Sequence, residues 1–283
     1  MGHFVETNGI KLHYHDYPGG DREPLLLMHG LTANAHSFSG LINAGLAENR
    51  RVLLVDLRGR GLSDKPEYGY TMPDHAADII GMLDALGINR VVLGGHSFGG
   101  LLTLYTAANF PERVKKLVVI DAAAEVARIE IVELIKPSLQ RLGQRVPSAD
   151  DYVERIKAAP YFHDGFWDEH LEAFYRADVT LNEDGTVSAH AGASQMTQAI
   201  DGVLAEDWHA HFAKIDQPAL LIQAPEGFGP PGTPSVVSTE GAQETVNLLK
   251  NCQHVQVEGN HITMMFGKHA PNMVKTITTF IDE

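Results

Sequence analysis

The first half of the chain alternates short, continuous apolar runs with segments whose apolar residues recur at helical spacing. The apolar runs cover residues 25–28, 52–55, 91–93 and 117–120. Helical spacing occupies residues 74–86 and 99–109, which end at Gly87 and before Pro111. Continuous apolar strands that alternate with helices are typical of a parallel sheet covered on both faces. We therefore expect an α/β protein.

The chain begins with a pattern of a different kind. Residues 3–5 and 10–15 have strand character, and Thr7-Asn8-Gly9 separates them. Asn-Gly tolerates the positive φ angles that a tight hairpin turn requires. The sequence thus predicts an antiparallel hairpin ahead of the parallel strands.

The pattern of apolar and polar residues changes between residues 122 and 215. Strand-like runs stop there, and helical patterns replace them at residues 125–142, 149–159, 167–177 and 195–212. Strands return at 219–222 and 254–257, with helices at 241–250 and 271–281. We interpret residues 1–121 and 216–283 as one α/β core domain and residues 122–215 as a helical cap inserted into it.

Charge and composition narrow the class of protein. The 283 residues carry a formal net charge of −14, which argues against nucleic acid and anionic membrane surfaces as partners. No apolar stretch approaches the ~20 residues that span a bilayer. The start of the chain lacks the basic and apolar regions of a signal peptide, and the single cysteine, Cys252, forms no internal disulfide. We expect a cytoplasmic protein.

The sharpest chemical signal is Gly95-His96-Ser97-Phe98-Gly99, which lies directly after a predicted strand and before a predicted helix. G-x-S-x-G in that setting is the nucleophile elbow, a sharp turn that presents the serine hydroxyl. The flanking glycines leave room for the close backbone approach, and the helix N-terminus directs N–H groups toward the serine. Ser97 is therefore the candidate nucleophile.

A serine nucleophile needs a general base, and His261 is the candidate. It follows a predicted strand and precedes the last predicted helix. Reactive groups gather at the carboxyl ends of the strands in an open α/β sheet. We therefore expect His261 and Ser97 at the same edge of the sheet.

Two residues compete to be the acid that orients the imidazole. Asp121 follows the strand after the nucleophile helix, and Glu226 follows the strand at 219–222. Both fit the chain order serine, acid, histidine. We favour Asp121, because Glu226 stands between Pro225 and Gly227 in a Gly/Pro-rich loop, a poor support for a precisely held carboxylate. Glu226 remains the alternative triad acid.

The oxyanion hole is expected from two backbone N–H groups. One belongs to Phe98, the residue after the nucleophile. The other comes from the loop after the strand at 25–28, where we favour Leu31.

These motifs together resemble the α/β-hydrolase fold over essentially the whole chain. The resemblance is carried by His29-Gly30, the Asp56 to Asp64 segment, the Gly95 to Gly100 segment, and Gly259-Asn260-His261. It implies an eight-stranded, mostly parallel sheet with an inserted helical cap and a serine hydrolase mechanism. The segment from Asp56 to Asp64 is similar to the family's D-x-R-G-x-G-x-S, which shapes the floor of the site.

One departure from the family pattern affects the acid. Many members carry an aspartate in a G-x-x-D segment after the strand that matches 219–222, whereas this chain has Gln223-Ala224-Pro225-Glu226-Gly227. Some ester hydrolases and amidohydrolases of this fold carry the acid one strand earlier, at a spacing that matches Asp121. The resemblance thus supports Asp121 and leaves Glu226 open.

We expect a carboxylesterase-like enzyme that cleaves an ester or related acyl bond of a small, largely apolar substrate. Amide, lactone, thioester or carbon–carbon hydrolysis on the same triad, a ligand receptor and a cofactor-free oxygenase are the alternatives. No cofactor or metal is expected, and the partner is a small-molecule substrate bound by a monomer or homodimer. Cap aromatics such as Tyr161, Phe174 and Tyr175 either line an acyl pocket or, as we favour, pack the cap core.

Overall fold

The computed structural model describes residues 2–125, 129–162, 165–230 and 232–283. Its main sheet contains seven strands: β1 (Gly2–Thr7), β2 (Ile10–Met28), β3 (Arg50–Val55), β4 (Val91–His96), β5 (Val114–Ile120), β8 (Ala219–Gln223) and β9 (Cys252–Gln256). The order is β1-β2-β4-β5-β8-β9, with β3 paired to β2. β4, β5, β8 and β9 are mutually parallel, and β1 and β2 form the expected antiparallel hairpin. The expected α/β fold is confirmed.

The main sheet has seven strands where eight were expected. The reason is that Ile10–Met28 forms one long strand that folds back on itself. Its first half pairs with β3 in descending order, from Tyr14 opposite Val55 to Tyr17 opposite Val52. Its second half pairs with β3 in ascending order, from Leu25 opposite Val52 to Met28 opposite Val55. The two halves therefore flank β3 and occupy the places of two separate strands.

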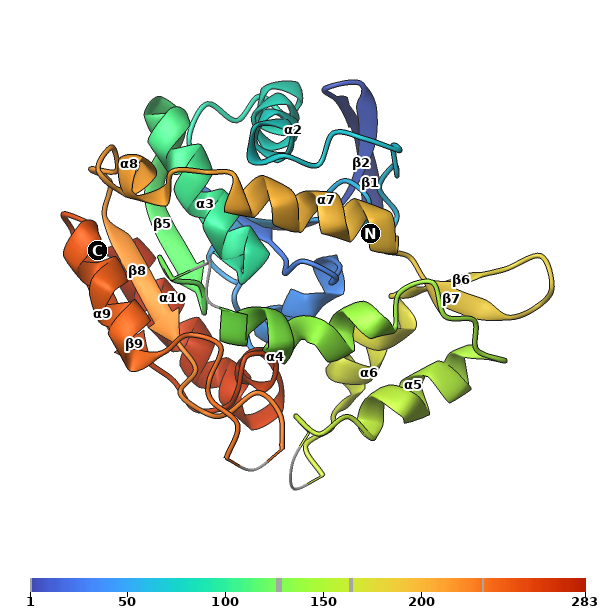
Figure 1. The fold of residues 1–283 in the computed structure, drawn as a ribbon. Coiled ribbons are helices and arrows are strands. Elements are labelled where there is room, and N and C mark those ends of the chain that lie inside the picture. The colour runs from blue at the N-terminus through green and yellow to red at the C-terminus, as the bar shows by residue number, and fades with distance from the viewer. Residues whose placement is uncertain (1, 126–128, 163–164, 231) are drawn as a thin grey trace.

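Helices cover both faces of the sheet (Figure 1). They are α1 (Ser39–Asn43), α2 (Met72–Ala85), α3 (Phe98–Asn109), α9 (Thr239–Leu248) and α10 (Ala270–Asp282). Alternate residues of β2 enter two separate cores: Leu26 and Met28 pack in the core that contains residues of α2, α3 and α9, whereas Leu25 and Leu27 pack with residues of α1 and α10. Burial on both faces explains why these strands are continuous apolar runs.

Short 3₁₀ helices connect several of these elements. They are Ala35–Phe38, Pro111–Arg113, Thr263–Met265 and Gly267–His269. Among the residues that the structure describes, no helix combines the length and the apolar character needed to cross a membrane.

The segment between β5 and β8 is mostly helical, as expected, with two differences. It contains α4 (Ile129–Gln140), α5 (Ala149–Lys157), α6 (Glu169–Arg176), β6 (Val179–Leu181), β7 (Val187–Ala189), α7 (Ala193–Leu204) and α8 (Trp208–Phe212). The single helix predicted at 195–212 is two helices, and part of the helix predicted at 125–142 lies outside the described residues. The β6–β7 hairpin was not predicted. The sequence does carry one indication of it, because Asp184-Gly185 is typical of a tight hairpin turn. Gly185 adopts a φ of 83° there.

Candidate active site

Ser97 stands at the sharp turn between β4 and α3. Its φ is 55° and its ψ is −118°, a conformation that a non-glycine residue adopts only under strain. A Cβ on Gly95 would lie 2.1 Å from the carbonyl oxygen of Gly99, and a Cβ on Gly99 would lie 2.0 Å from that of Met28. The two flanking glycines are therefore required by the close approach of backbone to backbone.

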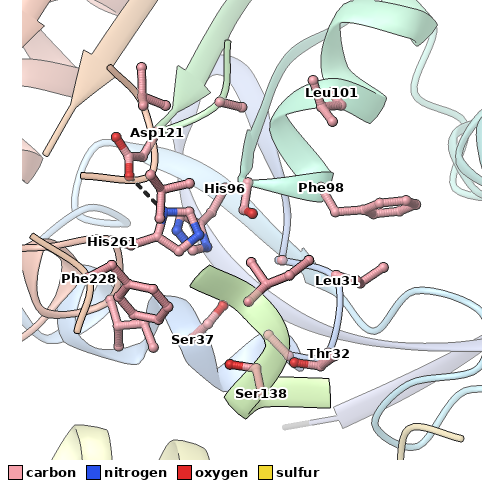
Figure 2. Close-up of a pocket in the computed structure, with 18 of the residues that line it drawn as sticks. Leu31, Thr32, Ser37, His96, Phe98, Leu101, Asp121, Ser138, Phe228 and His261 are labelled. Atoms are coloured by element: carbon pink, nitrogen blue, oxygen red, sulfur yellow. Dashed lines mark hydrogen bonds and ion pairs between the residues drawn. The ribbon is translucent and has the colours of Figure 1, made fainter. Parts of the chain in front are cut away.

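Asp121 and His261 meet at the carboxyl edge of the sheet. Asp121 directly follows β5, and its Oδ2 accepts a hydrogen bond of 2.6 Å from Nδ1 of His261 (Figure 2). Its Oδ1 accepts a second bond of 2.9 Å from the backbone N–H of Ala224, and both side chains are buried. The carboxylate is thus held from two sides and holds the imidazole in turn.

Glu226 makes a different contact. Its Oε1 accepts a hydrogen bond of 3.0 Å from the backbone N–H of Gly259, two residues before His261. The structure therefore brings Asp121 to the imidazole ring, whereas Glu226 braces the backbone of the loop that carries His261.

A cavity of about 180 Å³ joins these groups. Ser97, His261, Asp121, Phe98 and Leu31 all line it. Its walls are largely apolar, and the side chains that build them come from both the sheet core and the segment between β5 and β8: Leu101, Ile135, Leu139, Tyr161, Phe174, Tyr175, Ile200, Val203 and Phe228. Tyr161, Phe174 and Tyr175, which lie between β5 and β8, are thus both buried and part of the cavity wall.

The two backbone groups expected to form the oxyanion hole border the same cavity. Phe98 is the first residue of α3, so its N–H has no acceptor within the helix. Leu31 follows β2, and its carbonyl accepts a hydrogen bond of 2.8 Å from Nε of Arg60. The Arg60 guanidinium lies 5.0 Å from the centre of the Phe98 ring. One buried side chain therefore contacts both residues.

The segment from Asp56 to Asp64 is fixed by a buried network around Asp56. The Asp56 carboxylate accepts hydrogen bonds from the backbone of Ala35 at 2.7 Å, the backbone of Leu62 at 3.0 Å and Nδ1 of His13 at 2.8 Å. Burial by itself raises the pKa of Asp56, but these hydrogen bonds outweigh it and hold the pKa at about 2. The loop after β2 is consequently anchored to the Asp56 carboxylate through the N–H of Ala35.

His96 lies beside the candidate base. Its ring centre is 4.3 Å from that of His261, and burial holds its pKa well below the usual value. Neither ring nitrogen has a hydrogen-bond partner among the residues that the structure describes. His96 is therefore a neutral packing surface for the His261 imidazole.

Sequence reasoning missed the polar groups of the cavity wall. Ser138 lies in the last turn of α4, and Arg141 directly follows that helix. Ser37 comes from the 3₁₀ helix after β2. No sequence motif marks them, because the fold alone brings them together. Within the described ranges, no group of three or more His, Cys, Asp or Glu side chains has an arrangement that could hold a metal ion.

Most of the chain matches one known protein family. The model of the alpha/beta hydrolase fold family matches residues 23–267, most of the chain. The chain belongs to this family. The expected resemblance is confirmed over the range that carries the elbow, Asp121 and His261.

Relatives with similar sequences include two hydrolases. The chain is 29% identical to 2-(acetamidomethylene)succinate hydrolase of Mesorhizobium japonicum over 98% of its own length and 94% of that protein. It is 35% identical to 2-hydroxy-6-oxo-2,4-heptadienoate hydrolase of Pseudomonas putida over 43% of this chain and 45% of that one. Among solved structures, E-2-(acetamidomethylene)succinate hydrolase superposes with a TM-score of 0.85 at 24% identity, covering 100% of this chain and 99% of that chain. These relatives support a hydrolase on this fold.

Proposed function

We propose that this chain is a serine hydrolase that cleaves a carboxylic ester or related acyl bond of a small substrate. The observation that carries the proposal is one cavity lined both by Ser97, in a strained turn, and by His261, whose Nδ1 is hydrogen bonded to the buried Asp121. Nucleophile, base and orienting acid in that order are the parts of an acyl-transfer triad.

The chemistry follows from which imidazole nitrogen carries the proton. Nδ1 donates to Asp121, so Nε2 is the basic nitrogen that takes the proton of the Ser97 hydroxyl. Ser97 then attacks the acyl carbon, and the protonated His261 gives that proton to the leaving group. Water, activated by the same imidazole, releases the acyl group from the enzyme in the second half of the reaction.

The developing negative charge falls on the former carbonyl oxygen. We propose that the N–H groups of Leu31 and Phe98 donate hydrogen bonds to this oxygen. The N-terminus of α3 adds the positive end of the helix dipole. The segment 122–215, as a cap, would cover the site and exclude water, since its side chains form a large part of the cavity wall.

An amide substrate is the second candidate. The observation that favours it is the similarity, over nearly the full length of both chains, to a relative whose substrate name contains an acetamido group. The same triad serves both reactions, and the leaving group distinguishes them: an alcohol from an ester, an amine from an amide.

The test is intact-mass spectrometry after treatment with a fluorophosphonate. We expect one adduct on the wild-type protein and none on Ser97→Ala. A well-folded wild-type protein that forms no adduct would contradict the proposal and leave a ligand receptor or a cofactor-free oxygenase of the same fold. If the wild-type protein reacts with the fluorophosphonate, its rates of hydrolysis of matched ester and amide substrates then separate the two candidate reactions.

A further inference from the structure

One end of the cavity is polar and contains a guanidinium. Arg141, Ser138, Thr32 and Ser37 all line the cavity, and Arg141 donates to the carbonyls of Thr32 and Ser138. In Figure 2 the side chains of Thr32, Ser37 and Ser138 lie on the side of His261 away from Asp121. Arg141 is the one lysine or arginine among the described residues that line the cavity. A cation in a mostly apolar cavity indicates a binding function.

Arg141 does not use all its hydrogen-bond donors within the protein. Nη2 lies 3.0 Å from Oδ2 of Asp178 and donates to the carbonyl of Thr32 at 2.8 Å. Nη1 makes one long contact of 3.4 Å with the carbonyl of Ser138. A guanidinium carries five N–H donors, and Nε has no acceptor among the described residues. The side chain is 14% exposed, and Arg141 lines the cavity.

The pair with Asp178 orients the guanidinium. Asp178 is buried and also accepts a hydrogen bond from the hydroxyl of Tyr152, so its carboxylate is shared between two donors. Arg141 is held mainly through Nη2, whereas its Nη1 makes only the long contact with the carbonyl of Ser138. Glu125, a carboxylate that lines the cavity, accepts hydrogen bonds from the backbone N–H and hydroxyl of Ser238 at 2.8 and 2.9 Å.

Ser37 provides an independent indication that a polar ligand group binds in this cavity. The residue is 2% exposed, borders the cavity, and its hydroxyl has no hydrogen-bond partner within the described part of the chain. Buried hydroxyls without a partner are rare, because an unsatisfied polar group is costly. A ligand that accepts a hydrogen bond here would satisfy it.

We propose that Arg141, with Ser37, Thr32 and Ser138, binds a carboxylate of the substrate, so that the substrate is an acyl compound with an anionic group away from the scissile bond. This inference rests on the proposed function and specifies its substrate class. It specifies the expected, largely apolar substrate as one that has an apolar body and one anionic end. The planar fork of a guanidinium matches the two oxygens of a carboxylate. A single arginine already paired with Asp178 balances a singly charged group better than a phosphate dianion.

The experiment compares two probes that differ only in charge: mono-para-nitrophenyl succinate and its methyl ester. Their affinities are measured by calorimetry on Ser97→Ala, which removes the candidate nucleophile so that binding is read without turnover. We expect the anionic probe to bind about tenfold more tightly, the effect of a charge-assisted hydrogen bond. Equal affinities, or binding of neither probe, would overturn the carboxylate subsite.

Variants assign the preference to Arg141. Arg141→Met combined with Asp178→Asn removes both charges of the buried pair together, and we expect the two probes to bind it equally. Arg145→Gln removes an arginine whose side chain is 61% exposed and pairs with Asp184, and we expect it to retain the preference. A preference that survives in the folded double variant overturns the assignment.

Ser37→Ala keeps the proposal testable if the double variant fails to fold, because it deletes only an unpartnered hydroxyl. We expect about a fivefold loss of affinity for the anionic probe alone, and unchanged affinities overturn the subsite. Fluorophosphonate labelling is scored separately. Absent labelling with a retained charge preference contradicts the hydrolase and not the anion subsite, whereas labelling without the preference contradicts only the subsite.

Discussion

Nε of Arg60 donates a hydrogen bond of 2.8 Å to the carbonyl oxygen of Leu31. The same side chain is fully buried, donates from Nη1 to the carbonyl of Arg58 at 2.7 Å, and lies over the ring of Phe98. Leu31 and Phe98 are the two residues whose N–H groups we propose as the oxyanion hole. Arg60 therefore contacts both residues that we propose to form the oxyanion hole.

Arg60→Met tests this arrangement. Loss of the hydrogen bond frees the peptide between Leu31 and Thr32 to rotate, which also displaces Leu31 and its own N–H, and we expect kcat to fall by about ten- to a hundredfold, somewhat less than loss of a whole oxyanion donor. KM should change little, since the ground state uses the hole weakly. Arg51→Met removes an arginine that pairs with Asp16 and is the control. Equal kcat values for both variants would contradict a positioning role.

The paired variants Asp121→Asn and Glu226→Gln separate the two candidate acids. Asp121→Asn replaces the acceptor of the Nδ1 proton with an amide, which favours the wrong tautomer, and we expect kcat to fall about ten-thousandfold. Glu226→Gln keeps an oxygen for the N–H of Gly259 and should leave kcat close to wild type. Steady-state kinetics on both proteins decide the matter, and the reverse ranking would refute the assignment of Asp121.

Acid should weaken the fold through His29. This histidine is fully buried, with Nδ1 facing the carbonyl of Gly30 at 2.8 Å and Nε2 accepting from the N–H of Leu57 at 3.0 Å. Burial lowers the pKa of His29 to about 4. The unfolded chain binds this proton near the ordinary pKa of 6.5, so stability is fully present above pH 6.5 and falls as the pH drops toward 4, by at most about 3 kcal/mol.

Urea unfolding at several pH values between 7 and 4 measures this loss. In His29→Gln, whose amide oxygen can still accept from Leu57, we expect a shallower decline. Part of the decline should remain, because burial also lowers the pKa of His15 to about 4. A variant whose stability falls with pH as steeply as that of the wild type would show that His29 contributes nothing to acid sensitivity.

The glycines of the elbow should tolerate no side chain. A Cβ on Gly99 would stand 2.0 Å from the carbonyl oxygen of Met28, so Gly99→Ala forces backbone to move, and we expect more than about 3 kcal/mol of destabilisation. Gly87 has a φ of 66° but open space around it, and Gly87→Ala should cost only about 1 kcal/mol of backbone strain. Denaturant unfolding of the two variants compares them, and similar losses would disprove the steric explanation.

The sequence by itself determined what depends on local pattern. Continuous apolar runs predicted strands buried on both faces, and the turn of Gly95 to Gly99 marked the strand-to-helix junction at Ser97. Both follow from periodicity and from the steric demands of neighbouring residues. The hairpin of β6 and β7 was not predicted, because strands of three residues are too short to show a period.

Only the tertiary structure decided what depends on distant pairing. Asp121 and Glu226 follow neighbouring strands and look equivalent along the chain. In the fold, the N–H of Ala224 anchors Asp121 against His261, whereas Glu226 turns to Gly259. The return of β2 along both edges of β3 and the meeting of Arg141 with Thr32, 109 residues apart, are likewise absent from local pattern. Contacts of this kind arise from packing and strand register across the whole sheet, which no local stretch of residues encodes.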